Sequence, residues 1–308
     1  MHIAVIGCGS IGGYLAGLAA QAGHDVTVLG RGRTAQVVAK NGLQLRDSSG
    51  QRQISVTVLD ISDQKVVSLS TELVLLCVKT WQVPELIPQL SALVCEDTLV
   101  TTLQNGIGTS ELVAAAVGDR HVLAGTLMIM AEQLGPGTFL RRGELLDLEL
   151  GPICVRPHPK VQSAVAALAS TGLHVKLVHD ARHSLWRKLI FAAAVSGVPA
   201  MCGIPAGDAT ASPQVDDRIR AAIREGLAVA AAEGVTFSAA QVDQLIHDYV
   251  QLPPGMTSSM HRDIRSGRLN ELSAQNGAIV EMGRRHGIPT PTHSAVVSSL
   301  TATIPKPV

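Results

Sequence analysis

Proton transfer is the chemistry best suited to one lysine of this chain, because that lysine lies in an unusually apolar segment. Lys188 belongs to residues 184–201, SLWRKLIFAAAVSGVPAM, which the pattern predicts as a buried helix. Steps of four place Lys188, Ala192 and Ser196 on one stripe, which we expect to line a cleft. Apolar surroundings disfavour the ammonium form, so such a lysine donates a proton near neutral pH. The alternative is a lysine whose stem lies along the helix surface with its charge in water.

A carboxylate and two hydroxyls in residues 257–277 are the next candidates. Glu271 is expected to begin a helix over residues 271–287, where the helix dipole favours an acid, with Asn270 as the cap. Ser258 and Ser259 are either helix caps or hydroxyl donors to an anionic substrate. From the residues alone, both the structural and the functional interpretations stay open.

Residues 7–12, GCGSIG, have the glycine spacing of a dinucleotide-binding turn. They follow an apolar strand over 3–6, open an apolar helix and precede a second strand over 25–29, which is the context that the motif requires. The glycines permit a tight turn, close approach of a pyrophosphate and close helix packing. We therefore predict a dinucleotide site whose turn consists of Gly7, Cys8, Gly9, Ser10, Ile11 and Gly12.

The end of the second strand indicates which dinucleotide binds. An NAD site usually has an acid there for the ribose 2′-hydroxyl, whereas this chain has Gly30-Arg31-Gly32-Arg33. A guanidinium group suits a 2′-phosphate because it forms charge-assisted, forked hydrogen bonds. The sequence therefore predicts NADP(H), with Arg31 as the contact. The alternative is that both arginines are solvated at the start of the next helix.

Two further polar residues follow buried strands. Lys79 comes after the apolar run at 73–78, and Asn105 comes after the strand over 99–103. Ligands of open α/β sheets lie outside the carboxyl ends of the strands, so Lys79 and Asn105 are expected near the cofactor and its substrate. A solvated loop lysine and an Asn-Gly turn are the alternatives.

Composition excludes several classes of function. Lysine and arginine total 25, as do aspartate and glutamate, so nothing indicates binding to nucleic acid or an anionic membrane. We find no apolar run that is long and glycine-free enough to span a bilayer. The five cysteines form no CxxC pair and the eleven histidines lack ligand spacing, which predicts no metal site and favours a reducing, cytoplasmic location.

The strand signal ends near residue 178, and from residue 184 the pattern is helical. Within the first part we expect a hairpin over 42–59 and an antiparallel extension of the sheet with strands over 122–130, 137–139 and 145–150. The predicted fold class is α/β, with an N-terminal Rossmann dinucleotide-binding domain followed by an all-α C-terminal domain. We place the domains at residues 1–181, which bind NADP, and 182–308, which carry the substrate and catalytic groups.

Five ordered blocks resemble the ketopantoate reductase family, also called 2-dehydropantoate 2-reductases. They are GCGSIGG at 7–13, CVKTWQV at 77–83, LQNGIG at 103–108, LWRKLI at 185–190 and SSMHRDIRSGRLNELSAQNGAIVEMGRRHGIPTP at 258–291. The resemblance covers essentially the whole chain. It implies reduction of a 2-oxo acid by NADPH in pantothenate biosynthesis, at a site between a Rossmann domain and a helical domain, and pairing of two copies into a homodimer.

The resemblance also implies a role for each candidate. Lys188 would be the general acid, and Glu271 would bind substrate and orient that lysine. Ser259 would contact the substrate, while Lys79 and Asn105 would contact both cofactor and substrate. The glycine-rich turn and the arginine after the second strand would bind NADPH. Chemically this is consistent, because a ketone reduced by hydride needs its oxygen protonated.

Two positions depart from the family pattern. Members that act on ketopantoate carry asparagines one and two turns after the lysine, where this chain has Ala192 and Ser196. Losing an amide that binds a substrate hydroxyl lowers specificity for that hydroxyl. A dehydrogenase for D-2-hydroxy acids with more apolar side chains is therefore an alternative. A further alternative is a non-catalytic sensor of NADP, against which the retained Lys188 and Glu271 argue.

Overall fold

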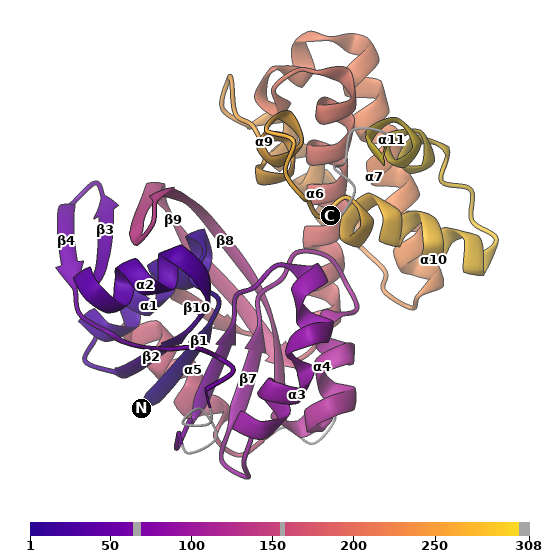
Figure 1. The fold of residues 1–308 in the computed structure, drawn as a ribbon. Helices are drawn as coiled ribbons and strands as arrows, with labels where there is room; N and C mark the ends of the chain where they lie inside the picture. The colour runs from indigo at the N-terminus through magenta and orange to yellow at the C-terminus, as the bar shows by residue number, and fades with distance from the viewer. Residues whose placement is uncertain (64–68, 155–157, 302–308) are drawn as a thin grey trace. The chain divides into compact units, whose positions relative to one another are not determined.

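The chain folds into two compact units in this computed structural model, which describes residues 1–63, 69–154 and 158–301 (Figure 1). One unit comprises residues 1–104 and 108–181 and contains the sheet, and the other comprises residues 105–107 and 182–308, of which 302–308 lie outside the described residues. Residues 105–107 therefore belong to the helical unit although they follow a strand of the sheet. The predicted α/β fold with an all-α C-terminal part is confirmed.

Six parallel strands form the centre of the sheet in the order β5-β2-β1-β6-β7-β8. Numbered along the chain, this is the order 3-2-1-4-5-6 of a doubly wound dinucleotide-binding fold. The direction of the order reverses between β1 and β6, and in folds of this kind ligands bind at the carboxyl ends of the strands on either side of such a reversal. The strands are β1 (His2–Ile6), β2 (Asp25–Leu29), β5 (Thr57–Leu59), β6 (Leu73–Leu76), β7 (Leu99–Thr102) and β8 (Val122–Gly135).

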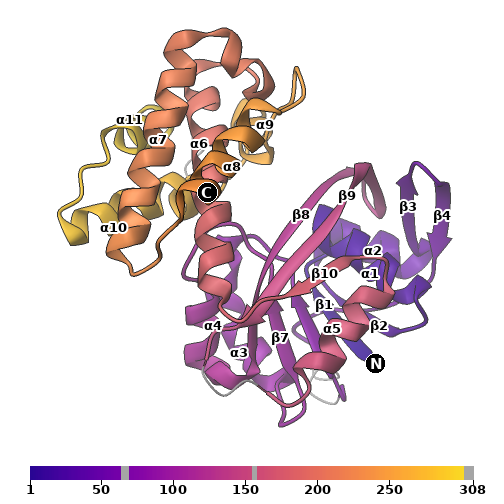
Figure 2. The same ribbon diagram turned by 180° about the vertical axis from the view of Figure 1, so that it is seen from behind.

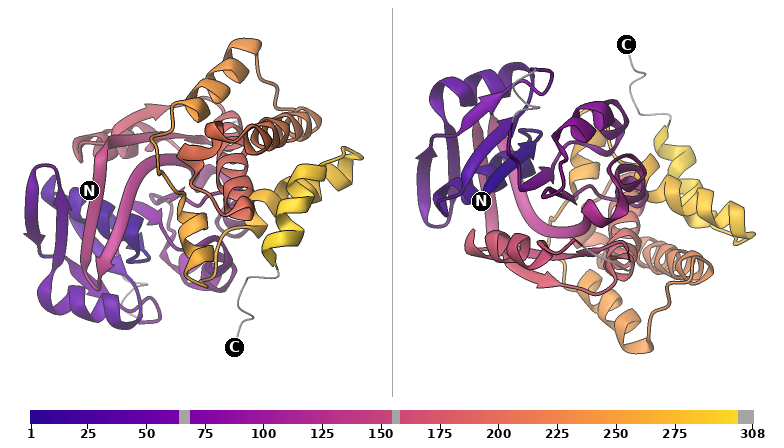
Figure 3. Two further views of the ribbon diagram at one scale, coloured as in Figure 1. Left: turned by 90° about the horizontal axis from the view of Figure 1, so that it is seen from above. Right: turned by 90° about the horizontal axis from the view of Figure 1, so that it is seen from below.

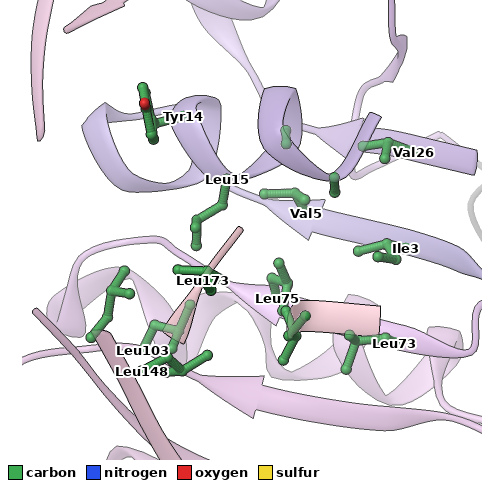
Figure 4. Close-up of a cluster of buried hydrophobic side chains, with 14 of the residues drawn as sticks. Ile3, Val5, Tyr14, Leu15, Val26, Leu73, Leu75, Leu103, Leu148 and Leu173 are labelled. Carbon is green, nitrogen blue, oxygen red and sulfur yellow. The ribbon is translucent and has the colours of Figure 1, made fainter. Parts of the chain in front are cut away.

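Alternate residues of β1 enter two different hydrophobic clusters. Ile3 and Val5 pack in one cluster with Leu75 of β6, and Figure 4 shows Leu15 of the first helix directed at the same group. Ala4 and Ile6 pack in the other. Because side chains alternate across a strand, a run buried at every position requires helices on both faces of the sheet.

Among the described residues of this unit, five α-helices pack on the sheet. Buried residues of α1 (Ser10–Gln21) and α5 (Val161–Ser170) join the first cluster, and those of α3 (Val83–Leu93) and α4 (Thr109–Val117) join the second. Figure 2 shows α3 and α4 side by side, well separated from α5. α2 (Gly32–Asn41) follows β2 and packs by β5.

The antiparallel extension is longer and simpler than predicted. Instead of three short strands, β8 pairs with one long strand, β9 (Thr138–Pro152), and the hairpin bends along its length (Figure 3). Register shifts at Ile129/Met130 and Gln133/Gly135 interrupt the alternation, which is why the sequence pattern looked like separate strands. β10 (His174–Leu177) pairs with β9 in parallel.

The hairpin expected over residues 42–59 ends earlier. It consists of β3 (Leu43–Asp47) and β4 (Gly50–Ile54), and β3 pairs with β9 rather than with the central strands. Residues 57–59 are not part of it, because they form β5, which pairs with β2 in parallel. The residue after β5 therefore lies beside the residues after β2.

The first long element of the helical unit is α6 (Ala181–Cys202), whose buried side chains between Trp186 and Val198 belong to the hydrophobic core of that unit. By length and composition this helix could span a membrane, contrary to our expectation of no such run, but 61% of its most apolar window is buried inside the molecule, as in a core helix. The elements after it are η4 (Ala206–Ala211), α7 (Pro213–Ala232), α8 (Ala239–Val250), α9 (Ser259–Arg265), η5 (Ser273–Gly277), α10 (Ala278–His286) and α11 (Pro291–Thr301).

The helix predicted over residues 271–287 starts later and irregularly. Glu271 precedes a short π-helical turn, η5, which leads into α10. Asn270 does bond locally, because its Oδ1 accepts the N–H of Leu272 at 3.1 Å. A π-helical turn widens the backbone and is common at functional sites.

Candidate functional site

The glycine-rich turn has the shape that a dinucleotide needs. Gly7 has φ +100°, and a Cβ there would lie 2.8 Å from Val78 Cγ1. A Cβ on Gly12 would lie 1.9 Å from the carbonyl oxygen of Gly7, so helix and strand pack at a distance that only glycine permits. A Cβ on Gly9 would meet nothing within 4 Å, which leaves open space beside the backbone.

The start of α1 presents unsatisfied N–H groups to that space. Gly9 is the N-cap, no side chain caps the helix, and its first turn contains no acid. Backbone N–H groups and the positive end of the helix dipole favour an anion at such a place. The residues present therefore fit a pyrophosphate, and Cys8, Ser10 and Ile11 lie in the same turn.

Arg31 lies just beyond β2, where it is the N-cap of α2. Its Nε is 3.6 Å from Oδ1 of Asp60, the residue after β5. The expectation of no acid at the end of β2 holds for the neighbouring sequence. The fold nevertheless brings an acid there from a different strand.

Lys79 lies beyond the end of β6, with its Nζ 5.8 Å from the centre of the Trp81 ring. The segment that carries it is held by Gln104, which is buried at the end of β7. Nε2 of Gln104 donates to the carbonyl oxygens of Leu76, at 2.8 Å, and Val78, at 3.0 Å. Gln104 thereby fixes the backbone that packs against the glycine-rich turn.

Lys188, Glu271 and Asn105 come together within the helical unit. Nδ2 of Asn105 donates to Oε2 of Glu271 at 2.9 Å. Glu271 is 5% exposed, and its charge acts on Lys188 of α6. The loop at 105–107 is held close to η5, since a Cβ on Gly106 would lie 2.3 Å from the carbonyl oxygen of Ala274.

Burial lowers the pKa of Lys188 to about 8, although the neighbouring charge of Glu271 acts in the opposite direction. Desolvation is the larger cause because the ammonium loses water in its apolar surroundings. A lysine with this pKa is protonated in a large fraction of molecules at neutral pH, yet releases its proton more readily than a solvated lysine. It is therefore suited to general acid catalysis.

A buried amide ties the segment after Glu271 to the helix that carries Lys188. Nδ2 of Asn276 donates to the carbonyl oxygen of Ala193 at 3.0 Å and contacts Nδ1 of His293 at 3.0 Å. His293 is fully buried and its Nε2 pairs with the carbonyl oxygen of Ala222. Burial lowers the pKa of this ring, which favours its neutral form. Asn276 accordingly fixes the distance between two candidate catalytic segments.

The remaining predicted residues are less closely grouped. Ala192 is partly buried one turn after Lys188, whereas Ser196 is buried. Of the expected stripe, only Lys188 and Ala192 are therefore partly exposed. Ser258 is the N-cap of α9 and accepts the N–H of His261 at 3.0 Å, which bears out the capping alternative for it. Ser259 is the exposed first residue of that helix.

Sequence reasoning missed three residues: Asp60, Gln104 and Asn276. Gln104 adjoins the candidate Asn105, and Asn276 lies in the candidate segment 257–277. A polar residue in an otherwise apolar or glycine-bounded run was the available signal for both. Asp60 had no such signal, because it reaches Arg31 only through the pairing of β5 with β2. In the described parts of the chain, no group of three or more His, Cys, Asp or Glu side chains could hold a metal ion, and no disulfide joins any of the five cysteines.

Comparison with known proteins covers both units. Residues 3–153 match the model of the ketopantoate reductase PanE/ApbA family, and residues 180–303 match the model of its C-terminal domain. A 2-dehydropantoate 2-reductase of Caulobacter vibrioides is 33% identical over 303 residues, which cover 97% of this chain and 98% of that protein.

Solved structures agree with this relationship. A PanE/ApbA family ketopantoate reductase from Ralstonia eutropha has a TM-score of 0.88 and 27% identity over 98% of both chains. A D-mandelate dehydrogenase, solved with NADH and anilino(oxo)acetate, has a TM-score of 0.91 and 22% identity, again over 98% of both chains. At that identity the second likeness shows the fold alone.

The predictions of an oxidoreductase acting on a CH–OH group and of a nicotinamide dinucleotide as cofactor are confirmed by these matches. A non-catalytic sensor is set aside, since the matched family consists of reductases. Two family models, which together span nearly all of the described residues, and a relative at 33% identity agree. The chain therefore belongs to the ketopantoate reductase family.

Proposed function

We propose that this protein reduces 2-dehydropantoate to pantoate with NADPH. The observation that carries the proposal is Lys188, whose lowered pKa suits proton donation, next to the Glu271 carboxylate that Asn105 holds by a 2.9 Å hydrogen bond. Residues 1–181 would form the coenzyme domain, and residues 182–308 would carry the substrate and catalytic groups. NADPH, when bound, supplies a hydride to the carbonyl carbon of the substrate.

The residues of this chain would divide the remaining work. The turn at residues 7–12 would bind the pyrophosphate and Arg31 the 2′-phosphate, with Lys79 and Asn105 nearer the reacting end. Lys188 Nζ would give its proton to the carbonyl oxygen as negative charge develops there, which produces the hydroxyl of the product. Glu271 would keep Lys188 charged before the transfer and orient it, while Ser259 would contact the substrate.

A second candidate substrate is a 2-oxo acid with a more apolar side chain. Ala192 stands one turn after Lys188 and offers a methyl group where an amide would bind a substrate hydroxyl. The likeness in fold to a D-mandelate dehydrogenase is compatible with this candidate. The two candidates share the hydride chemistry and differ only in what the pocket holds.

The test follows NADPH absorbance with 2-dehydropantoate, pyruvate, 2-oxoisovalerate and phenylglyoxylate. We expect 2-dehydropantoate to have the highest kcat/KM. Lys188→Ala should lower kcat about 10²- to 10⁴-fold, the usual contribution of a general acid, whereas Arg187→Ala, a matched change at the exposed neighbouring cation, should leave it unchanged. Turnover of none of the four acids by folded protein would overturn the proposal, and preference for phenylglyoxylate would favour the second candidate.

The proposal includes a homodimer in the cytoplasm. A ketopantoate reductase of Staphylococcus aureus, with a TM-score of 0.81 and 21% identity over 98% of both chains, is described as dimeric. Five cysteines that form no disulfide suit a reducing compartment. Light scattering at several protein concentrations tests the assembly, and a constant monomer mass would contradict it.

A further inference from the structure

Strand pairing brings an acid to the position where the coenzyme ribose is expected. Leu29 of β2 pairs with Leu59 of β5, and the N–H of Gly30 donates to the carbonyl oxygen of Leu59 at 3.1 Å. The residues that follow these two strands therefore lie side by side. One of them is Arg31 and the other is Asp60, whose Oδ1 is 3.6 Å from the Arg31 Nε.

Hydrogen bonds from the following loop stabilise the ionised form of Asp60. Its Oδ1 accepts the N–H of Ser62 at 2.9 Å and the hydroxyl of Ser62 at 2.5 Å. These hydrogen bonds lower the pKa of the Asp60 carboxyl, with a smaller effect from Arg31. The carboxylate consequently stays ionised at neutral pH, with its Oδ1 held by two hydrogen bonds from Ser62.

We propose that Asp60 is a specificity-determining residue of the coenzyme site. With Asp60 present, the preference for NADPH over NADH is smaller than the preference that Arg31 alone would give. A 2′-phosphate bound by Arg31 would be held close to a second anion, and repulsion between them weakens NADPH binding. A free 2′-hydroxyl carries no charge, so NADH is spared that repulsion, and a carboxylate is a good acceptor for such a hydroxyl. This inference rests on the proposed role of Arg31.

Solvent limits the size of the effect. The side chains of Arg31 and Asp60 are 55% and 52% exposed, so water and salt screen their charges. Exposed charge pairs change affinities by small factors, and a phosphate carries more than one charge, so removal of the Asp60 charge should strengthen NADPH binding about three- to fivefold. The gain should shrink at high salt.

The test compares Asp60→Asn with the unmodified protein and needs no substrate. Asparagine keeps an oxygen that can accept from Ser62, so the loop is preserved while the charge is lost. Dissociation constants for NADPH and NADH are measured by coenzyme fluorescence at low and high salt. In Asp60→Asn we expect the dissociation constant for NADPH to fall, while the dissociation constant for NADH stays the same or rises.

Asp25→Asn, at the opposite end of β2, is the matched control for net charge and should change neither dissociation constant.

Arg31→Ala separates this inference from the assignment on which it rests. If Arg31→Ala weakens NADPH alone and Asp60→Asn alters neither constant, the coenzyme assignment stands and the role of Asp60 is overturned. If Arg31→Ala also alters neither constant, both are overturned. Equal gains for NADPH and NADH in Asp60→Asn would contradict the specificity role as well.

Discussion

At the scale of single residues, the pKa of Lys188 determines a pH dependence. Because burial lowers this pKa to about 8, Lys188 is protonated below that pH and loses its proton as the pH rises through it. The kcat/KM for reduction of the 2-oxo acid should therefore fall above about pH 8, while oxidation of the 2-hydroxy acid, which needs the neutral amine, should rise over the same interval. Initial rates in both directions across this pH interval measure it.

A substitution of Glu271 tests whether Lys188 causes that pH dependence. Its charge raises the pKa of Lys188, so Glu271→Gln should move the fall in kcat/KM to lower pH. Arg187→Ala, on the same helix, should leave the profile in place. A pH profile that is the same in Lys188→Ala and Glu271→Gln as in the unmodified protein would mean that another group titrates.

At the scale of elements, Gly197 allows α6 to approach η5. A Cβ there would lie 2.6 Å from Asn276 Nδ2 and 2.8 Å from Val296 Cγ1. Gly197→Ala should destabilise the protein by about 1 to 3 kcal/mol, the cost of overpacking a core, despite the better helix propensity of alanine. Urea unfolding measures this, and in an Asn276→Ala background the cost of the same change should be smaller. An additive double variant would contradict the contact.

Gln104 tests a second connection between elements, from the end of β7 to the residues after β6. Gln104→Leu keeps the volume but removes the two donated hydrogen bonds, leaving the Val78 carbonyl without its side-chain donor. We expect coenzyme affinity to fall about 5- to 30-fold, as for a buried polar group that loses its partner. The dissociation constant is measured directly. A changed pH profile with unchanged affinity would indicate a role in catalysis instead of positioning.

At the scale of the whole molecule, the two units have separate hydrophobic cores and should respond differently to coenzyme. NADPH at 100 times its dissociation constant adds about 2.7 kcal/mol to the state that binds it, which corresponds to a rise of about 5 to 10 °C in the unfolding midpoint of a domain of this size. Calorimetry should place that rise in the transition of the α/β unit.

The two tryptophans allow the transitions to be assigned. Trp81 belongs to the α/β unit and Trp186 to the core of the helical unit. In a Trp81→Phe variant, fluorescence follows the helical unit alone, and its midpoint should rise less than that of the calorimetric transition. Equal rises would mean that the chain unfolds as one cooperative body.

The sequence by itself determined the features that depend on local pattern. The run at residues 7–12 needs only the neighbouring strand and helix to form its turn, and the apolar strands need only be buried on both faces, so both were predictable from spacing and composition. The apolar context of Lys188 likewise indicated a perturbed lysine. Irregular backbone was not predictable, because the π-helical turn after Glu271 and the register shifts of β8 and β9 are set by packing.

Tertiary structure alone decided which distant residues meet. Asn105 and Glu271 are far apart in the chain and come within 2.9 Å only after the loop at 105–107 joins the helical unit. Asp60 reaches Arg31 because β5 pairs with β2 and does not extend the hairpin of β3 and β4. Burial in the sheet determines this pairing, and no local sequence signal does. Local propensity fixes short-range shape, whereas long-range pairing depends on the whole core, and that is why the motifs could be read from the sequence and their partners could not.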